Sequence, residues 1–250
     1  MKKERIDKIL VAKGLAESPA KAQALVMAGV VLVNERRVEK SSESFLPTES
    51  FRIKGASPES KYVGRGGLKL EKALEEFRIS PENFVCLDVG ASTGGFTDCL
   101  LQAGAKKVFA VDAGTNQLVW QLRCDERVEA RESVNARHLK PEDFGEKFDL
   151  IVMDVSFISA TKILPALVSL LKENGKIIVL IKPQFEVKKG EVEKGGVVRD
   201  AGKHEQVILR VNEFAEKLGL KVSGVIDSPI LGAEGNKEFL ALYESGNKRI

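Results

Sequence analysis

Beyond residue 84 the sequence alternates apolar runs of strand length with amphipathic helical patterns. The strand candidates are Val85–Val89, Lys107–Val111, Val128–Ala130, Phe148–Asp154, Lys176–Ile181, Lys221–Ile226 and Lys237–Tyr243. The helix candidates between them are Phe96–Ala103, Asn116–Arg123, Ser159–Lys172 and Ala201–Leu218. This alternation predicts a mostly parallel sheet with helices on both faces, because parallel neighbours need crossovers long enough for a helix.

The connection before the last strand candidate is short. Residues 228–236 leave no room for a helical crossover, so the last strand is expected to pair antiparallel with its predecessor. We therefore expect the α/β class, with a seven-stranded, mostly parallel, Rossmann-like sheet whose last strand is antiparallel.

The start of the chain has a different pattern, which predicts a small α+β domain. Ser18 is expected to be the N-cap of a helix that has Pro19 at its first position. Short strands are expected at Val30–Asn34 and Phe51–Ile53, with a loop over residues 40–50.

The composition of the chain and its glycine-rich segment predict two domains. We expect a domain over residues 1–60, a glycine-rich linker over 61–67 and a second domain over 68–250. Residues 1–80 carry 16 Lys and Arg against 11 Asp and Glu, whereas residues 81–250 carry 23 against 25. A basic first third suits a polyanionic partner, although an ordinary solvated surface is the better explanation of this excess when it is taken alone.

Several function classes are disfavoured. The three cysteines form no CxxC pair, and the two histidines, His138 and His204, are far apart in sequence, so no metal site is expected. No apolar stretch reaches the ~18 residues that span a bilayer, and no signal-like segment follows the first residues. We therefore expect a cytoplasmic protein without a membrane partner.

The segment DVGASTGGFTD, residues 88–98, directly follows an apolar run. Its glycines let the chain turn sharply and bring backbone N–H groups close to a ligand. The next strand candidate ends at Asp112, where a carboxylate suits a ribose diol, and an adenine edge is expected beside Asn135. A tight turn with an ordinary capping aspartate is the alternative. The expected cofactor contacts are Asp88, Gly90, Ser92, Thr93, Gly94, Gly95, Phe96, Thr97, Asp112 and Asn135.

Charged residues end or begin elements that should meet at one crevice. Asp154 and Lys182 each end a central strand candidate, and ligands of open α/β sheets bind at the carboxyl ends of the strands. Lys69 lies at a helix start, where the helix dipole disfavours a cation, and Glu238 begins the last strand candidate. Such a set can remove a proton from a weakly acidic hydroxyl beside a bound methyl donor. Taken alone, Lys182 could be a solvated strand end and Lys69 a surface lysine, and Glu238 would be unremarkable.

A resemblance to a known family runs over nearly the whole chain. It is carried by GRGGLKL at 64–70, DVGASTGGFTD at 88–98, DVSFIS at 154–159, IKPQFE at 181–186, GVVRD at 196–200 and SPILGAEGNKEF at 228–239. These motifs resemble the TlyA family, whose members are often labelled haemolysin A and are similar to FtsJ-like ribosomal RNA methyltransferases. The N-terminal part resembles the RNA-binding domain named after ribosomal protein S4.

The resemblance implies transfer of a methyl group from S-adenosylmethionine to a ribose 2′-hydroxyl of ribosomal RNA, at a cytidine. Lys69, Asp154, Lys182 and Glu238 match the family's Lys-Asp-Lys-Glu tetrad. We assign the base role to Lys182, its orientation to Asp154, and the positioning of the ribose to Lys69 and Glu238. The RNA contacts that we expect are Arg5, Lys21, Arg36, Arg37, Arg65, Lys188, Lys189 and Arg199.

Two other functions remain as alternatives. One is a non-catalytic RNA-binding or ribosome-assembly factor whose cofactor pocket is only structural. The other is a haemolysin, as the family label suggests. The charged segment 186–199 is predicted to be a mobile loop over the cofactor or the RNA, with an ordinary surface insertion as its alternative.

Overall fold

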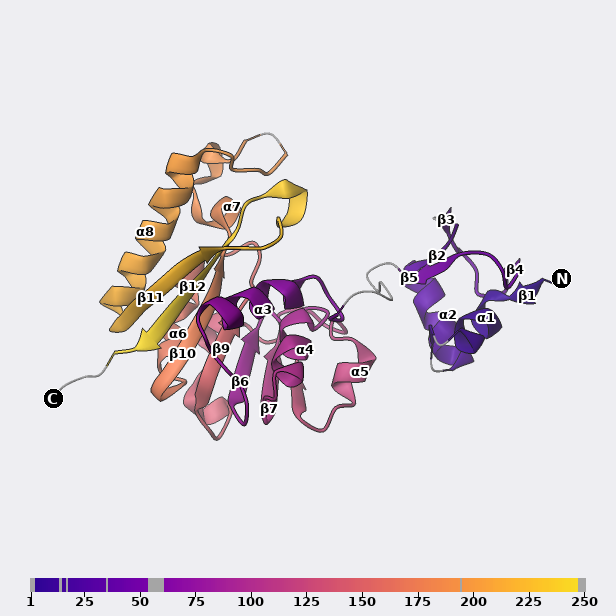
Figure 1. Ribbon diagram of the computed structural model, residues 1–250, viewed down its shortest axis with the longest axis horizontal. Helices are drawn as coiled ribbons and strands as arrows, with labels where there is room; N and C mark the ends of the chain where they lie inside the picture. Colours follow the sequence, from indigo (N-terminus) through magenta and orange to yellow (C-terminus); the bar gives the residue numbers. More distant parts are fainter. Residues whose placement is uncertain are drawn as a thin grey trace. The chain divides into compact units, whose positions relative to one another are not determined.

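The computed structural model describes residues 3–13, 15–16, 18–34, 36–53, 61–193 and 195–246. The chain divides into two compact units, Met1–Ser60 and Lys61–Ile250 (Figure 1).

The first unit packs two helices against short antiparallel strands. The helices are α1 (Ile6–Ala12) and α2 (Pro19–Met27); the strands are β1 (Glu4–Arg5), β2 (Val31–Val33), β3 (Arg36–Arg37), β4 (Ser44–Phe45) and β5 (Phe51–Ile53). Strand β2 pairs with β3 and β5, and β1 pairs with β4. The core of this unit contains Ile6, Leu10, Ala22, Val26, Val31 and Val33.

Helix α2 starts where the sequence predicts. The Ser18 hydroxyl accepts a hydrogen bond from the Lys21 backbone N–H at 3.3 Å, and Pro19 is the first helical residue. The continuous loop predicted over residues 40–50 is wrong, because Ser44–Phe45 form β4. The Phe45 ring meets Phe51 edge-on with centroids 6.3 Å apart, an apolar contact that a pattern of mostly polar residues conceals.

The second unit alternates strands and helices. Its strands are β6 (Val85–Val89), β7 (Lys107–Val111), β8 (Val128–Arg131), β9 (Phe148–Met153), β10 (Leu171–Ile181), β11 (Leu220–Asp227) and β12 (Phe239–Ser245). Its α-helices are α3 (Gly66–Glu76), α4 (Gly95–Gln102), α5 (Trp120–Arg123), α6 (Leu164–Val168), α7 (Pro183–Glu186) and α8 (Ala201–Lys217). Short 3₁₀ turns occur at Ala136–His138, Pro141–Asp143, Ala160–Lys162, Lys189–Glu191 and Ala233–Gly235.

The strands form one sheet in the order β11-β12-β10-β9-β6-β7-β8. Strands β10, β9, β6, β7 and β8 are parallel, whereas β12 runs antiparallel to both of its neighbours. This topology confirms the predicted class, a mostly parallel Rossmann-like sheet with an antiparallel last strand. In Figure 1, α8 lies along β11, and α3 lies beside α4.

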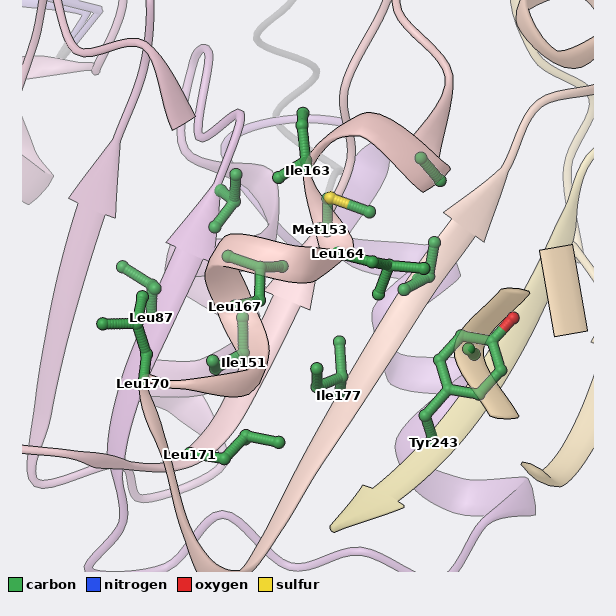
Figure 2. Close-up of a cluster of buried hydrophobic side chains, with 14 of the residues drawn as sticks. Leu87, Ile151, Met153, Ile163, Leu164, Leu167, Leu170, Leu171, Ile177 and Tyr243 are labelled. Atoms are coloured by element: carbon green, nitrogen blue, oxygen red, sulfur yellow. The ribbon is translucent and has the colours of Figure 1, made fainter. Parts of the chain in front are cut away.

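Alternate residues of each strand point to opposite faces of the sheet, and helices bury both faces. One face carries Leu87, Ile151, Ile177 and Tyr243, which form one buried cluster with side chains of α6 (Figure 2). Side chains of α8 belong to the same cluster. The other carries Cys86, Leu150 and Ile178, which pack with α3 and α4. Each fully buried side chain of this size contributes about 1.5–3 kcal/mol. Burial on both faces explains why the central strands read as continuous apolar runs.

Two predicted helices are wrong in extent. The helix expected over residues 159–172 is a 3₁₀ turn followed by the short α6, and the chain is already in β10 at Leu171, which pairs with Phe148 of β9. The helix expected over 116–123 is reduced to α5. Asn116 has a positive φ of 53°, and its backbone N–H and that of Gln117 donate to the Glu132 carboxylate, so the chain forms a loop there.

The segment 61–67, expected to be a linker, packs within the second unit. Tyr62 is buried, the Val63 N–H donates to the Asp98 carboxylate at 2.8 Å, and Gly66 and Gly67 begin α3. A glycine-rich segment is typical of a linker, but in this protein the glycines lack side chains so that the backbone of 61–67 can contact the start of α4 closely. A Cβ on Gly95 would lie 3.0 Å from the Gly67 nitrogen, so this segment and the start of α4 are in tight contact.

Candidate active site

The sheet register places the predicted charged residues at one edge. Val89 of β6 pairs with Met153 of β9, and Ile181 of β10 pairs with Phe239 of β12. Asp154 directly follows β9, Lys182 directly follows β10, and Glu238 directly precedes β12. Because β10 and β12 are antiparallel, Lys182 and Glu238 are the next residues along from the Ile181–Phe239 pair and lie opposite each other.

The first of two ion pairs joins Lys182 and Asp154. Lys182 Nζ lies 2.5 Å from Asp154 Oδ1 and donates a hydrogen bond to Ser156 Oγ at 2.9 Å. The side chains of Lys182 and Asp154 are 11% and 21% exposed. The Lys182 amine is therefore held in one position, and its side chain remains partly accessible to solvent. A carboxylate this close can orient the amine and hold it when it is protonated.

The second ion pair is more deeply buried. Lys69 Nζ donates to Glu238 Oε2 at 2.6 Å, and these side chains are 10% and 2% exposed. Lys69 lies on α3 one turn after Gly66, and a Cβ on Gly66 would stand 4.0 Å from Asp154 Oδ2. Helix α3 thus brings the second pair to the same edge of the sheet. The four predicted residues therefore form two separate ion pairs, Lys182–Asp154 and Lys69–Glu238.

Two cavities open at this edge and share Gly90, Ser92, Asp154 and Ser156 in their walls. The first has a volume of about 210 Å³ and is lined by Gly64, Arg65, Gly66, Gly90, Ala91, Ser92, Thr93, Gly95, Phe96, Asp154, Ser156 and Lys182. The second has a volume of about 310 Å³ and adds Asp112, Gln117, Asn135, Ala136, Ile158 and Ile163 among others. The Lys182–Asp154 pair lies in the wall of the first cavity, and the second is also lined by residues that follow β7 and β8.

Asp112 is held by the glycine-rich turn. Its Oδ2 accepts a hydrogen bond from the Ser92 N–H at 2.8 Å, and its Oδ1 accepts one from the Gly114 N–H at 2.7 Å. Each carboxylate oxygen can accept a further bond, so the side chain can still receive two hydroxyl donors. Gly90 supports this close geometry, since a Cβ there would stand 2.3 Å from the Asp154 carbonyl oxygen.

Three predicted cofactor contacts lie outside both cavity walls. Asp88 and Thr97 are fully buried, and Thr97 Oγ1 donates to Asp88 Oδ2 at 2.6 Å. Burial raises the pKa of the Asp88 carboxyl to about 7, partly opposed by the Thr97 hydrogen bonds. Gly94 has a φ of +104°, and a Cβ there would meet Leu122 at 2.2 Å. These residues support the turn from beneath, a placement that the spacing of the motif does not reveal.

The basic residues predicted in the first unit differ in environment. Arg36 and Arg37 are exposed on β3, and Lys21 lies on α2. Arg5 is bound to Asp7, with nitrogen–oxygen distances of 2.6 and 3.1 Å. This hydrogen bond lowers the pKa of the buried Asp7 carboxyl to about 2, so Arg5 has a structural role in addition to any RNA contact.

In the second unit, two of the predicted RNA contacts already have protein partners. Arg65 lines the first cavity and donates to the Leu231 carbonyl at 2.9 Å. Arg199 pairs with Glu193 at 2.6 Å. Lys188 is exposed, whereas the side chain of Lys189 lies outside the described residues.

An aromatic pair beside the site was missed from the sequence. Phe157 lies on the loop that carries Asp154, is 90% exposed and has a φ of +64°, which is rare for an aromatic residue. Its ring lies 5.1 Å from that of Phe185, which follows Lys182 on α7. The signal was an aromatic residue three positions after each strand-end charge.

In the described part of the chain, every helix is too short or too polar to cross a lipid bilayer. The same residues hold no group of three or more His, Cys, Asp or Glu side chains arranged to bind a metal ion.

Comparison with known proteins gives consistent relatives. Residues 62–244 match the FtsJ-like methyltransferase family, and residues 4–47 match the S4 domain. A Bacillus subtilis protein named as a candidate rRNA methyltransferase, YqxC, is 48% identical, with 96% of this chain and 85% of the relative covered. The 16S/23S rRNA (cytidine-2′-O)-methyltransferase TlyA of Mycobacterium tuberculosis is 44% identical, with 95% and 88% covered. The solved structure of a candidate hemolysin from Streptococcus thermophilus has a TM-score of 0.74 and 46% identity, with 99% of this chain and 90% of the other covered.

Proposed function

Since the chain belongs to the FtsJ-like methyltransferase family, we propose that it transfers a methyl group from S-adenosylmethionine to a ribose 2′-hydroxyl of ribosomal RNA, at a cytidine. The observation that carries this proposal is the Lys182–Asp154 pair, 2.5 Å apart in the wall of a cavity that the glycine-rich turn also lines. The name of the 44% identical relative supports the choice of ribosomal RNA and of cytidine.

The residues present fit S-adenosylmethionine. Asp112 retains acceptor capacity for a ribose diol, Asn135 lies in the wall of the same cavity, and Gly90 leaves the backbone open to close approach. When bound, this cofactor supplies an electrophilic methyl group on a positively charged sulfur. The wall residue shared by both cavities that bears a negative charge is Asp154, which suits a cationic neighbour.

Lys182 is the proposed base. In its neutral form, Nζ would accept the proton of the ribose hydroxyl, whose oxygen would take the methyl group, and the bound cofactor would leave as the neutral thioether. Asp154 Oδ1 and Ser156 Oγ then hold the ammonium that forms, at the 2.5 and 2.9 Å observed. General-base assistance of this kind contributes roughly 10²–10⁴ in rate.

Lys69 and Glu238 are proposed to position the ribose. Their ion pair is buried and short, so Glu238 holds the more exposed Lys69 ammonium in a fixed position at the sheet edge that also carries Lys182. Removing freedom from reacting groups in this way can contribute as much as the proton transfer itself. The exposed Phe157 ring, on the loop that carries Asp154, offers a surface on which a base can stack.

The first unit is proposed to supply RNA affinity. Its match to the S4 domain and the exposed Arg36 and Arg37 support this role. Contacts of this type bind the phosphate backbone and position the substrate without reading its sequence. A ribosomal substrate would place the protein in the cytoplasm.

The test is methyl transfer from labelled S-adenosylmethionine to purified small and large ribosomal subunits, with a red-cell lysis assay in parallel. The proposal predicts label in ribosomal RNA, recovered after nuclease digestion as 2′-O-methylcytidine. Label on a base instead of a ribose, or RNA binding without any transfer, contradicts it. Transfer to neither subunit together with cell lysis would favour the haemolysin alternative.

A further inference from the structure

Glu186 lies close to the proposed base but takes no part in the steps above. It is the last residue of α7, the four-residue helix that starts immediately after Lys182. The residue is 8% exposed, and its side chain is 2% exposed. It lines neither of the two cavities of the candidate site, so its carboxylate is explained by the groups that it holds.

The Glu186 carboxylate bonds to the loop that carries Asp154. Its Oε2 accepts a hydrogen bond from Ser159 Oγ at 2.6 Å, and its Oε1 accepts one from the Ala160 N–H at 2.7 Å. These donors are five and six residues after Asp154, at the start of the 3₁₀ turn Ala160–Lys162. The loops that follow β9 and β10 are thus joined a second time, beyond the Lys182–Asp154 pair.

Three successive contacts connect the two loops. Lys182 meets Asp154 and Ser156, the ring of Phe185 meets Phe157 at 5.1 Å, and Glu186 meets Ser159 and Ala160. In both chain segments the order of the contacts is the same, so the loops run side by side. Loss of the third contact would leave only the first two, so the loops would be held less firmly where they carry the reacting amine and its carboxylate.

Burying the Glu186 carboxylate costs free energy, because the charged group loses its contact with water. Burial raises the pKa of the Glu186 carboxyl, and the compensating charge, Arg210 of α8, is 3.8 Å from Oε2. Arg210 also donates to the Glu186 backbone carbonyl. An apolar residue of similar volume would pack here at lower cost. The two directed hydrogen bonds are what such a residue could not provide.

We propose that Glu186 is a positioning residue for methyl transfer, which fixes the separation of Lys182 and Asp154 by bonding Ser159 and Ala160. The inference rests on the proposed function. Its physical basis is that a misplacement of about 1 Å in reacting groups can cost roughly 10² in rate even when the substitution is remote from the chemistry.

The test compares Glu186→Ala and Glu186→Gln with Asp149→Ala under single-turnover conditions on ribosomal RNA. Asp149 is a matched control because its carboxylate also accepts a backbone N–H, that of Val85 at 2.9 Å, at the opposite end of β9. That end is about 16 Å from Asp154 along the strand. Glutamine can keep both contacts, since its amide oxygen accepts from Ala160 and its NH₂ donates to Ser159.

We expect Glu186→Ala to lower the single-turnover rate roughly 10–100-fold while the KM for RNA and the Kd for S-adenosylmethionine change less than about threefold. Glu186→Gln should restore the rate to within about threefold of wild type, and Asp149→Ala should leave it unchanged. A Glu186→Ala rate no lower than that of Asp149→Ala, or a loss confined to KM, overturns the inference.

A second readout covers loss of fold and failure of the proposed function. If Glu186→Ala does not fold, Ser159→Ala removes one of the two bonds, and an unchanged rate overturns the inference. If the wild type and Asp149→Ala transfer no methyl group to RNA, the proposed function fails, and crystal structures then decide on Glu186. A Lys182–Asp154 separation that lengthens in Ser159→Ala or Glu186→Ala supports the positioning role, and an unchanged separation excludes it.

Discussion

Replacing Gly232 by alanine should disturb the active site through Glu238. A Cβ at Gly232 would stand 2.0 Å from Glu238 Oε1 and 2.4 Å from its carboxyl carbon. Ordinary contact begins at 3.4 Å, so the carboxylate must retreat by about 1.4 Å. Glu238 is 2% exposed, which leaves it little room, and Lys69 Nζ is bonded to its other oxygen at 2.6 Å. The substitution therefore moves the buried pair.

The size of the effect follows from this geometry. Gly232 does not have a positive φ, so alanine is compatible with the backbone and only the contact causes strain. Overpacking of this kind costs typically 1–3 kcal/mol of stability. Complete loss of the pair would cost about 3–5 kcal/mol, which sets the upper limit. A displacement near 1 Å at the ribose-positioning pair should lower the rate of methyl transfer roughly 10–100-fold.

The assay measures single-turnover methyl transfer and urea unfolding for Gly232→Ala and for Gly190→Ala. Gly190 is the control because no atom lies within 4 Å of where its Cβ would be and its φ is not positive. It should be neutral, or stabilising by up to about 1 kcal/mol. If Gly232→Ala transfers methyl groups within twofold of the wild-type rate, Glu238 does not need its observed position and the reasoning is refuted.

Three further predictions concern stability and RNA binding. Burial raises the Asp88 pKa to about 7 from an ordinary 3.8, so the contribution of Asp88 to stability should be fully present below about pH 4, fall by up to a few kcal/mol as the pH rises to about 7, and stay constant above. Denaturation of the wild type at a series of pH values should show this slope, and an equally large slope in Asp88→Asn would exclude Asp88 as its source. Lys69→Met should destabilise the protein by about 3–5 kcal/mol because it leaves Glu238 buried and unpaired, and the further substitution Glu238→Leu should recover part of this stability in urea unfolding while methyl transfer stays lost. If the double variant recovers no stability, Lys69 and Glu238 do not act as a pair. Phe157→Ala should leave the melting temperature unchanged because the ring is 90% exposed, but it should weaken RNA binding by about 1–3 kcal/mol through the loss of a stacked base. An RNA affinity equal to that of the wild type in a filter-binding assay would rule the stacking out.

The fold was predictable because the buried strands are apolar without interruption and the last connection is too short for a helix. Both signals are local in sequence and come directly from burial on two faces and from the geometry of crossovers. The helix over 159–172 was not predictable in the same way. Its apolar residues suit a helix, but Leu171 is taken by the sheet through its pairing with Phe148. That choice depends on a partner 23 positions away in the chain.

The candidate site shows the same division. Strand ends identified Asp154, Lys182 and Glu238, since parallel topology collects such positions at one edge. Sequence could not show that the four charges separate into two pairs, because pairing depends on side-chain direction. Nor could it separate residues that line a cavity, such as Gly90, from those beneath the turn, such as Asp88. Phe157 was missed because exposure is a property of the folded surface.

The central claim is that Lys182 accepts the ribose proton, and the most direct measurement is the single-turnover rate of Lys182→Ala on ribosomal RNA. Lys176→Ala is the control, since Lys176 is on the same strand and pairs with Glu244 at 2.6 Å away from the cavities. The account predicts that Lys182→Ala is slower by roughly 10²–10⁴ with unchanged affinity for S-adenosylmethionine, whereas Lys176→Ala matches wild type. A Lys182→Ala rate within tenfold of wild type would contradict it.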